Sequence, residues 1–260
     1  MQESEQDQFE KLIPRGKIDI HCHLIPGVDD GCANIEESIA IIEELKLHGY
    51  VGSICTPHIW KEMFPIMSAS HIDRWVEQME EELVGRDLNY ALWTGGEIRL
   101  HKRVIEEWKE EGVITLAKSK YVLVDFWEPK WARWVNKSFE YLLSEGYKPI
   151  LAHPERLPEM KKIDKYLESL LAEGVLLQGN FQCFTGEAGY QADVNIRRWM
   201  DAGYYTFLAM DAHRPDSIFS RIDGLDIAMA TYSQQTIREM TEIKPRELIL
   251  GLQSTVTDQY

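Results

Sequence analysis

The sequence contains no run of about 18 consecutive apolar residues, so it predicts no transmembrane helix. Positive charge is also scarce, because 28 Lys and Arg residues stand against 43 Asp and Glu residues, a formal net charge of −15. A chain this acidic is expected to bind neither nucleic acid nor an anionic membrane surface. Its first residues, MQESEQDQFEKL, are polar and acidic, unlike a signal peptide. We therefore expect a cytoplasmic protein with a flexible extension over residues 1–16 and one domain over residues 17–260.

Cysteine chemistry is excluded as well. The four cysteines form no CxxC pair, which indicates reduced thiols and no disulfide framework. A cysteine-dependent tyrosine phosphatase needs an arginine six positions after its cysteine, but those positions hold Val28, Ser38, Lys61 and Gly189. The sequence also lacks a Gly-x-Ser-x-Gly elbow and a phosphate-binding Gly-Lys-Ser/Thr loop.

The pattern that is present is a seven-fold alternation of short strand-like segments and amphipathic helical stretches. The predicted strands are residues 17–20, 51–55, 90–95, 121–126, 149–152, 175–180 and 205–210. The predicted helices lie near residues 34–48, 70–84, 100–110, 131–145, 159–172, 190–201 and 217–237. Such alternation predicts an α/β fold with a parallel sheet, either doubly wound or closed into a barrel.

The ends of the predicted strands carry the functional signal. Six of the seven finish in potential metal ligands, which are His21, His23, His58, Glu97, Asp125, His153, Asp211 and His213. In a barrel the carboxyl ends of the strands converge on the face that holds the active site. The pattern therefore favours a TIM-like barrel of seven βα units over a doubly wound sheet. His48, His71 and His101 lie on or beside helices, and we assign them no role in the site.

Imidazoles mixed with carboxylates, without cysteine, suit Mn, Fe or Zn. The ligands are too many for one ion and enough for two or three. Clustered ions about 3.5–4 Å apart suit the hydrolysis of phosphate esters. Such a centre would also offer a phosphate dianion a positive site on an otherwise acidic protein.

The motifs DIHCH, VDDG, TPH, GGE, AHPER and DAH occur in this order. With them, residues 17–251 resemble the polymerase-and-histidinol-phosphatase (PHP) superfamily, and within it the bacterial capsule-regulating protein-tyrosine phosphatases of the CpsB/CapC group. The resemblance implies a distorted seven-stranded βα barrel with a trinuclear centre, often of manganese. It also implies that a metal-activated hydroxide hydrolyses phosphotyrosine. The expected substrate is a bacterial tyrosine kinase that regulates capsular or extracellular polysaccharide synthesis.

The same resemblance assigns roles to single residues. It implies three metal sites, formed by His21, His23, Glu97 and Asp211, by Glu97, Asp125 and His153, and by Asp30, His58 and His213. It gives Arg156, in AHPER, the role of gripping the phosphate, while Asp30 and His213 are both candidates for the general acid.

Two positions depart from the family pattern. Asp125 stands where the family usually has the longer Glu, with Glu128 as an alternative ligand. Ile218 stands where an arginine usually follows the last histidine, and Arg214 or Arg221 are its possible substitutes.

Two other functions stay open at this point. One is a histidinol-phosphate or other small-molecule phosphomonoesterase of the same fold, and the other is a nonenzymatic, metal-stabilised module. The aromatic stretch at residues 126–142 has two interpretations too. Trp127 is expected at the rim of the site, where it could stack on a tyrosine ring. A buried helical stripe is expected for Trp131, Val135, Phe139 and Leu142.

Overall fold

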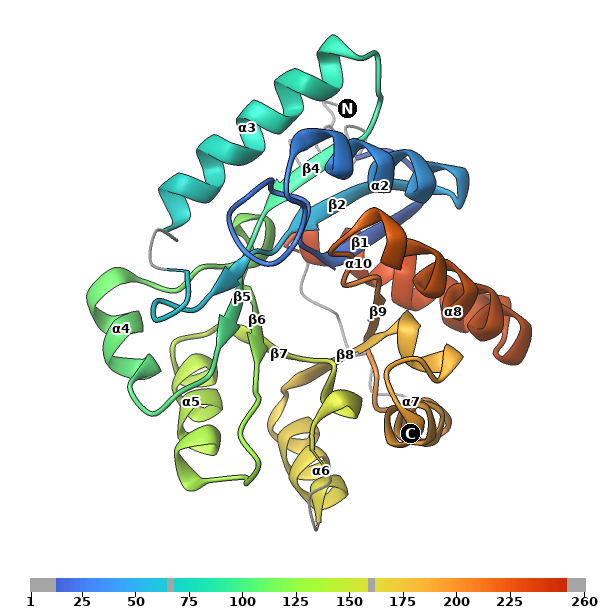
Figure 1. Ribbon diagram of the computed structural model, residues 1–260. Coiled ribbons are helices and arrows are strands. Elements are labelled where there is room, and N and C mark those ends of the chain that lie inside the picture. The colour runs from blue at the N-terminus through green and yellow to red at the C-terminus, as the bar shows by residue number, and fades with distance from the viewer. Residues whose placement is uncertain (1–12, 65–67, 159–161, 252–260) are drawn as a thin grey trace, which may run out of the picture.

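The computed structural model describes residues 13–64, 68–158 and 162–251. These residues form an α/β fold whose strands pair in parallel, as expected from the alternating pattern. The strands are arranged in two sheets (Figure 1). The smaller sheet has the order β1 (Lys17–Cys22), β2 (Tyr50–Cys55), β4 (Ala91–Thr94). The larger has the order β3 (His58–Ile59), β5 (Glu97–Arg99), β6 (Tyr121–Asp125), β7 (Lys148–Ala152), β8 (Leu176–Asn180), β9 (Phe207–Ala209).

The strands divide into two sheets because β2 and β4, which match predicted segments, are each followed after a break by a short strand that was not predicted, β3 and β5. Pro57 lies between β2 and β3, and it has no N–H to donate to a neighbouring strand. Gly95 and Gly96 lie between β4 and β5. The described strands therefore form no continuous closed barrel. β1 and β9 still meet, because the Asp211 N–H donates to the carbonyl of His21 at 2.8 Å and Cys22 bridges Ala212.

Seven long helices surround the strands and match the predicted stretches within a few residues (Figure 1). They are α2 (Ile35–Leu47), α3 (Ala69–Gly85), α4 (Val104–Glu111), α5 (Arg133–Ser144), α6 (Ile163–Glu173), α7 (Tyr190–Asp201) and α8 (Ile218–Thr231). Helix α2 begins where expected because Asn34 caps it, its side-chain oxygen accepting the Glu37 N–H at 3.1 Å. The start of the stretch predicted at 159–172 lies outside the described residues.

The last predicted helix is wrong in one respect. Residues 217–237 do not form one helix, because α8 ends at Thr231 and α9 (Gln234–Arg238) starts anew. Ser233 caps α9 by accepting the Thr236 N–H at 3.1 Å, which satisfies a free amide at the new helix start. A π-helical turn (Glu239–Ile243) and α10 (Lys244–Ile249) follow, and neither was predicted. Short 3-10 turns lie at Leu116–Lys118, Pro154–Arg156, Phe181–Thr185 and Pro215–Ser217.

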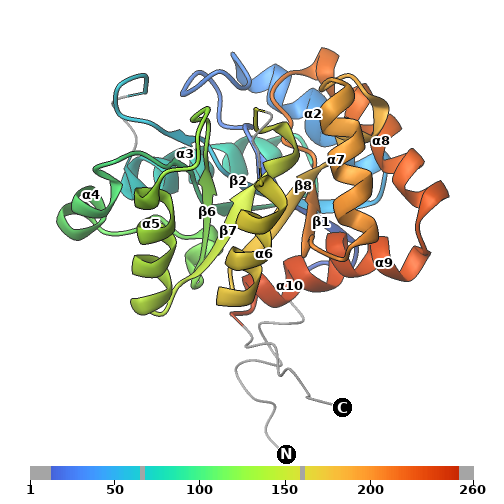
Figure 2. The ribbon, with the colours of Figure 1, turned by 90° about the horizontal axis from the view of Figure 1, so that it is seen from below.

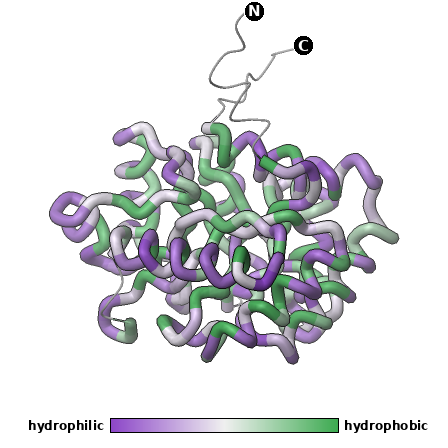
Figure 3. The backbone as a smooth tube through the Cα atoms, turned by 90° about the horizontal axis from the view of Figure 1, so that it is seen from above, coloured by the Kyte–Doolittle hydropathy of each residue, from purple (hydrophilic) through white to green (hydrophobic). Residues whose placement is uncertain are grey.

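The hydrophobic core has an outer and an inner part. The outer part lies between strands and helices, and the segments of the chain inside the molecule are correspondingly hydrophobic (Figure 3). Val135, Phe139 and Leu142 of α5 are fully buried there, as expected, whereas Trp131 precedes the helix and packs against the core only partly buried. The inner part is enclosed by strand residues such as Ile20 and Phe207.

Helix α10 covers the amino-terminal end of the strands (Figure 2) and adds Leu248 to the inner core. Ile13 joins the same core, and Arg246 donates to its carbonyl at 3.1 Å. The structure therefore differs from the expected flexible extension at its last residues, because burial of Ile13 holds them to the domain. Residues 1–12 of that extension lie outside the described residues. No helix in the described ranges is long and apolar enough to cross a membrane.

Candidate metal centre

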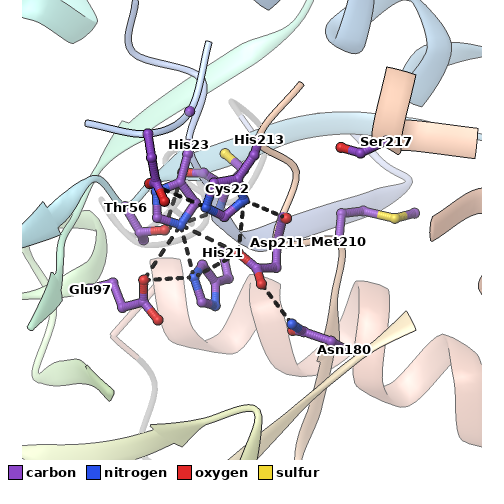
Figure 4. Close-up of polar contacts among 12 residues, drawn as sticks. His21, Cys22, His23, Thr56, Glu97, Asn180, Met210, Asp211, His213 and Ser217 are labelled. Carbon is purple, nitrogen blue, oxygen red and sulfur yellow. Dashed lines mark hydrogen bonds and ion pairs between the residues drawn. The ribbon is translucent and has the colours of Figure 1, made fainter. Parts of the chain in front are cut away.

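The carboxyl ends of the strands bring the predicted ligands together (Figure 4). Three groups of side chains have their ligand atoms within 4.8 Å of one another. They are His23, Asp30, His58 and His213; His21, His23 and Asp211; and His21, Glu97 and His153. Eight of the nine predicted ligands thus belong to one continuous cluster.

Asp125 is the ninth predicted ligand and joins none of these groups. Its Oδ1 lies 3.9 Å from Nδ1 of His153, so it borders the cluster without reaching its centre. The aspartate side chain is one methylene shorter than the glutamate expected at this position. Glu128, the alternative ligand, is half-buried and also belongs to none of the groups.

The spacing around Nε2 of His21 fits metal coordination better than hydrogen bonding. Nε2 of His21 lies 3.3 Å from Nε2 of His23, and 3.4 Å from both Glu97 Oε2 and Asp211 Oδ1. Good N–H···O hydrogen bonds are shorter, about 2.7–3.2 Å. Two atoms that each lie about 2.1 Å from one ion are separated by roughly 3.0–3.4 Å in common coordination geometries.

Two buried carboxylate oxygens give an independent indication. Asp125 Oδ1 is buried and accepts no hydrogen bond from the described residues, and Glu97 Oε2, although it lies 2.8 Å from Nδ1 of His58, accepts none of good geometry from them either. A buried carboxylate oxygen without a partner costs free energy, and a cation would remove that cost. The donor set of imidazoles and carboxylates therefore fits divalent ions.

The charges in the cluster are strongly coupled. Burial by itself would raise the pKa of Glu97, but the nearby His21 and His58 outweigh it and hold that pKa well below its usual range. At Asp125 burial dominates, and together with the charge of Glu97 it raises the pKa to about 8. Positive charge at the centre thus stabilises the Glu97 carboxylate. Because the ligand imidazoles must be unprotonated, metal ions compete with protons for this cluster.

Two of the ligands sit on unusual backbone. His153 (φ 30°) and Asp211 (φ 50°) occupy the left-handed region, which is uncommon for residues other than glycine. Hydrogen bonds hold both turns, since the His153 N–H donates to the Gln178 carbonyl at 2.7 Å and the Asp211 N–H to that of His21. Such conformations concentrate at functional sites, and here they orient two side chains at the strand ends.

Gly31 fixes the position of His23 by close packing. A Cβ at Gly31 would lie 2.3 Å from the His23 carbonyl oxygen and 2.5 Å from the His23 Cβ. We expect Gly31→Ala to displace His23, to lower the free energy of unfolding by about 1–3 kcal/mol, and to lower bound metal. Urea unfolding and metal analysis measure the two effects.

Gly85→Ala is the matched control, because no atom lies within 4 Å of the added methyl. We expect it to change neither quantity appreciably. Wild-type stability and metal content in Gly31→Ala would contradict the close-packing interpretation.

Cys22 lies between two ligands but points away from them. Its side chain is fully buried, and its Sγ donates to the carbonyl of Ile54 at 3.3 Å. Alternation along an extended strand explains the opposite directions of Cys22 and its neighbours. We expect Cys22→Ser to keep its metals and its turnover, since the hydroxyl can donate to the same carbonyl. Loss of metal-dependent turnover in the folded variant would show that the thiol takes part.

Several residues around the ligands escaped prediction. Asp29 accepts a hydrogen bond at its Oδ2 from the His58 N–H at 3.0 Å, and the same oxygen lies 2.7 Å from Nδ1 of His23. It therefore orients the His23 ring. The adjacent carboxylates of VDDG were the available signal, but the sequence cannot tell which of the two reaches the metals. Gln178 and Asn180 of β8 were also missed, although they are polar residues in an otherwise apolar segment.

Arg156 lies at the site, as expected. Its Nη1 donates to Oδ2 of Asp211 at 2.7 Å, and its guanidinium lies 5.2 Å from the ring centre of Trp127. Trp127 is 40% exposed and its ring centre is 6.0 Å from that of His153, a position at the rim. Glu155, which could have formed a surface ion pair with its neighbour Arg156, is buried. It accepts hydrogen bonds from the Asn180 N–H and the Tyr205 hydroxyl, each at 2.7 Å. Glu159, the other possible partner, lies outside the described residues.

The two possible substitutes for a second arginine differ in their surroundings. Arg221 is buried and donates to the carbonyls of Asp211 and Ser217 at 2.9 and 2.8 Å, so it braces the turn that carries Asp211. Arg214 is exposed. The two candidate acids lie together, since Asp30 Oδ1 is 3.5 Å from Nε2 of His213, and Asp30 is 59% exposed.

Two sheets of parallel strands whose ends gather five imidazoles and several carboxylates define an α/β protein with a candidate metal centre. The family model for capsular polysaccharide synthesis, CpsB/CapC, matches residues 17–249. The chain therefore belongs to the CpsB/CapC family, which confirms the resemblance found in its motifs.

Individual relatives agree with this assignment. The tyrosine-protein phosphatase YwqE of Bacillus subtilis is 29% identical over 196 residues, which are 75% of this chain and 77% of that protein. The tyrosine-protein phosphatase CpsB of Streptococcus pneumoniae is 27% identical over 240 residues, 90% of this chain and 98% of that one. A crystal structure from work on YwqE and CpsB, described as metal-dependent tyrosine phosphatases, superposes with a TM-score of 0.80. It is 25% identical and covers 90% of this chain and 94% of its own.

Proposed function

We propose that this protein is a metal-dependent protein-tyrosine phosphatase. The observation that carries the proposal is the cluster of imidazoles and carboxylates around Glu97, with Arg156 at its edge, in a member of the CpsB/CapC family. Relatives that align with most of this chain are named tyrosine-protein phosphatases.

The ions that we propose for this site are two or three Mn ions, with Fe or Zn as alternatives. One would be held by His21, His23, Glu97 and Asp211, a second by Glu97, Asp125 and His153, and a third by Asp30, His58 and His213. When bound, such ions supply an activated hydroxide and neutralise charge on the phosphoryl oxygens. The buried Oδ1 of Asp125, which accepts no hydrogen bond from the described residues, supports this assignment.

The protein side chains account for binding and orientation. In the described part of the chain Arg156 uses only Nη1 in a hydrogen bond, so its other N–H groups are available to phosphate oxygens. The exposed face of Trp127 can stack on the aromatic ring of the substrate. Asp30 or His213 would hold the proton that the departing tyrosine oxygen takes up. Phenolate is a fairly good leaving group, so this proton transfer has a small share in the rate.

The physiological setting is part of the proposal. We propose that the protein is cytoplasmic and that its substrate is a phosphotyrosine protein, a bacterial tyrosine kinase that regulates capsular or extracellular polysaccharide synthesis. We further propose that residues 17–260 form one domain, a distorted barrel of the PHP type. The family match to capsular polysaccharide synthesis and the meeting of β1 with β9 support these points.

Turnover of two substrates by metal-free protein reloaded with Mn²⁺, Fe²⁺ or Zn²⁺ tests the function. We expect kcat/KM for a phosphotyrosine peptide to exceed that for histidinol phosphate by at least ~10-fold, about 1.4 kcal/mol in transition-state stabilisation. The opposite preference would indicate a small-molecule phosphomonoesterase. Stoichiometric metal binding without turnover of either substrate would indicate a nonenzymatic module.

A further inference from the structure

We infer that Gln178 and Asn180 form a directional hydrogen-bond relay that sets which ring nitrogen of His21 carries the proton and so frees Nε2 for a metal ion. Both residues lie on β8, the one predicted strand whose end carries no expected metal ligand. They are positioning residues, because they act through His21 and Asp211. The inference rests on the metal-binding part of the proposed function.

The relay is a continuous chain of buried contacts. Nδ1 of His21 lies 2.8 Å from Oε1 of Gln178, and Nε2 of Gln178 donates to Oδ1 of Asn180 at 2.7 Å. Nδ2 of Asn180 then donates to Oδ2 of Asp211, also at 2.7 Å (Figure 4). All four side chains are at most 2% exposed, so water does not compete with these bonds.

Asp211 determines the direction of the relay. Its Oδ2 also accepts a hydrogen bond from Nη1 of Arg156, a permanently charged donor, so this oxygen acts as an acceptor. Asn180 must therefore present its amide NH₂ to Asp211 and its oxygen to Gln178. Gln178 must in turn present its NH₂ to Asn180, which leaves its oxygen facing His21.

The consequence falls on His21. An oxygen opposite Nδ1 requires a proton on Nδ1, because two acceptors cannot form a hydrogen bond. In the neutral ring Nε2 is then the unprotonated nitrogen, and Nε2 is the atom that lies 3.3–3.4 Å from His23, Glu97 and Asp211. Partners of this kind commonly fix the tautomer and orientation of metal-binding histidines. The same relay ties His21 to Arg156 through a shared oxygen of Asp211.

The direct test is the proton position on His21 in the wild-type protein. Two-bond ¹H–¹⁵N spectra of the histidine-labelled protein, recorded with and without Zn²⁺ at a pH above the imidazole titration, report which ring nitrogen carries the proton. Comparison with the spectrum of His21→Gln identifies the signal of His21. We expect a proton on Nδ1 in both states. A proton on Nε2 of metal-free His21 would overturn the relay, and this measurement requires no variant of Gln178.

Substitution of Gln178 tests the effect on the metals. We expect Gln178→Met to weaken Zn²⁺ and Mn²⁺ binding by about 10- to 100-fold in calorimetric titrations, with a mixed His21 tautomer. Gln178→Glu retains an acceptor opposite Nδ1, so we expect it to keep the Nδ1 proton. Unchanged affinity and an unchanged spectrum in folded Gln178→Met would contradict the proposal, whatever the turnover of any substrate.

A double-mutant cycle separates a relay from two independent contacts. If Gln178 and Asn180 act in series, the losses of affinity in Gln178→Met and Asn180→Ala should not add in the double variant. Additive losses would show independent roles. Asn195→Ala is the control, since Asn195 of α7 is also a buried amide, 6% exposed, and accepts a hydrogen bond from Gln191; we expect wild-type affinity and spectrum.

Discussion

A protein with His21 and His23 both replaced by Ala should lose its phosphatase activity and most of its bound metal. Both imidazoles belong to the proposed site with Glu97 and Asp211, and each of the three clusters of ligand atoms contains at least one of them, so the double substitution removes one site and disturbs its neighbours. We expect kcat to fall at least ~1000-fold, about 4 kcal/mol in activation free energy. Turnover of a phosphotyrosine peptide and metal analysis of the purified variant measure the two losses.

The control for this experiment is the pair His48→Ala and His71→Ala. His48 pairs with Glu44 on α2, and His71 contacts Ser68 at the start of α3. Neither belongs to a ligand group, so this variant should retain its metals and its rate. Circular dichroism of both variants against metal-free wild type separates loss of the site from loss of the fold. Full activity and metal content after replacement of His21 and His23 would refute the location of the site.

Arg156→Lys should fold and keep its metals yet lose at least ~10-fold in kcat/KM, equivalent to about 1.4 kcal/mol. The guanidinium can bond to Asp211 through Nη1 and to phosphate through its remaining N–H groups at the same time. A lysine ammonium offers a point charge without this planar fork, so it cannot satisfy both partners in the same geometry. Steady-state kinetics on a phosphotyrosine peptide, with metal content determined on the same sample, measure the effect.

Arg86→Lys is the matched control, because Arg86 pairs with the exposed Glu36 at the surface. An exposed ion pair of this kind contributes little to stability, and we expect wild-type kinetics. Wild-type kinetics in Arg156→Lys would show that Arg156 does not bind the phosphate. Loss of metal in that variant would show that its hydrogen bond to Asp211 supports the metal ligands.

Asp125 is the one proposed metal ligand outside the three groups of ligand atoms. Its Oδ1 is buried at the edge of the cluster and accepts no hydrogen bond from the described residues. His153 and Glu97 belong to one group with His21, so an ion there could bind with or without Asp125. Metal analysis of Asp125→Ala against wild type distinguishes these arrangements.

The sequence by itself determined the parts of this protein that depend on local patterns. Apolar periodicity located helix α2, and the alternation of segments indicated parallel strands. The ligands at the strand ends were visible because the carboxyl ends of parallel strands share one side of a sheet. This rule brings His21 and His153 together although they are far apart along the chain.

Only the tertiary structure decided the rest, because those features depend on partners that are remote in sequence. Ile13 is buried by an inner core that α10 completes, and the breaks at Pro57 and Gly95 matter only once the strands pair. In the sequence Gln178 is an ordinary polar residue, and only the position of β8 in the fold brings its Oε1 to 2.8 Å from Nδ1 of His21. The hydrogen-bond partner of one ring nitrogen of a metal-binding histidine sets which nitrogen is protonated, and only the fold determines that partner.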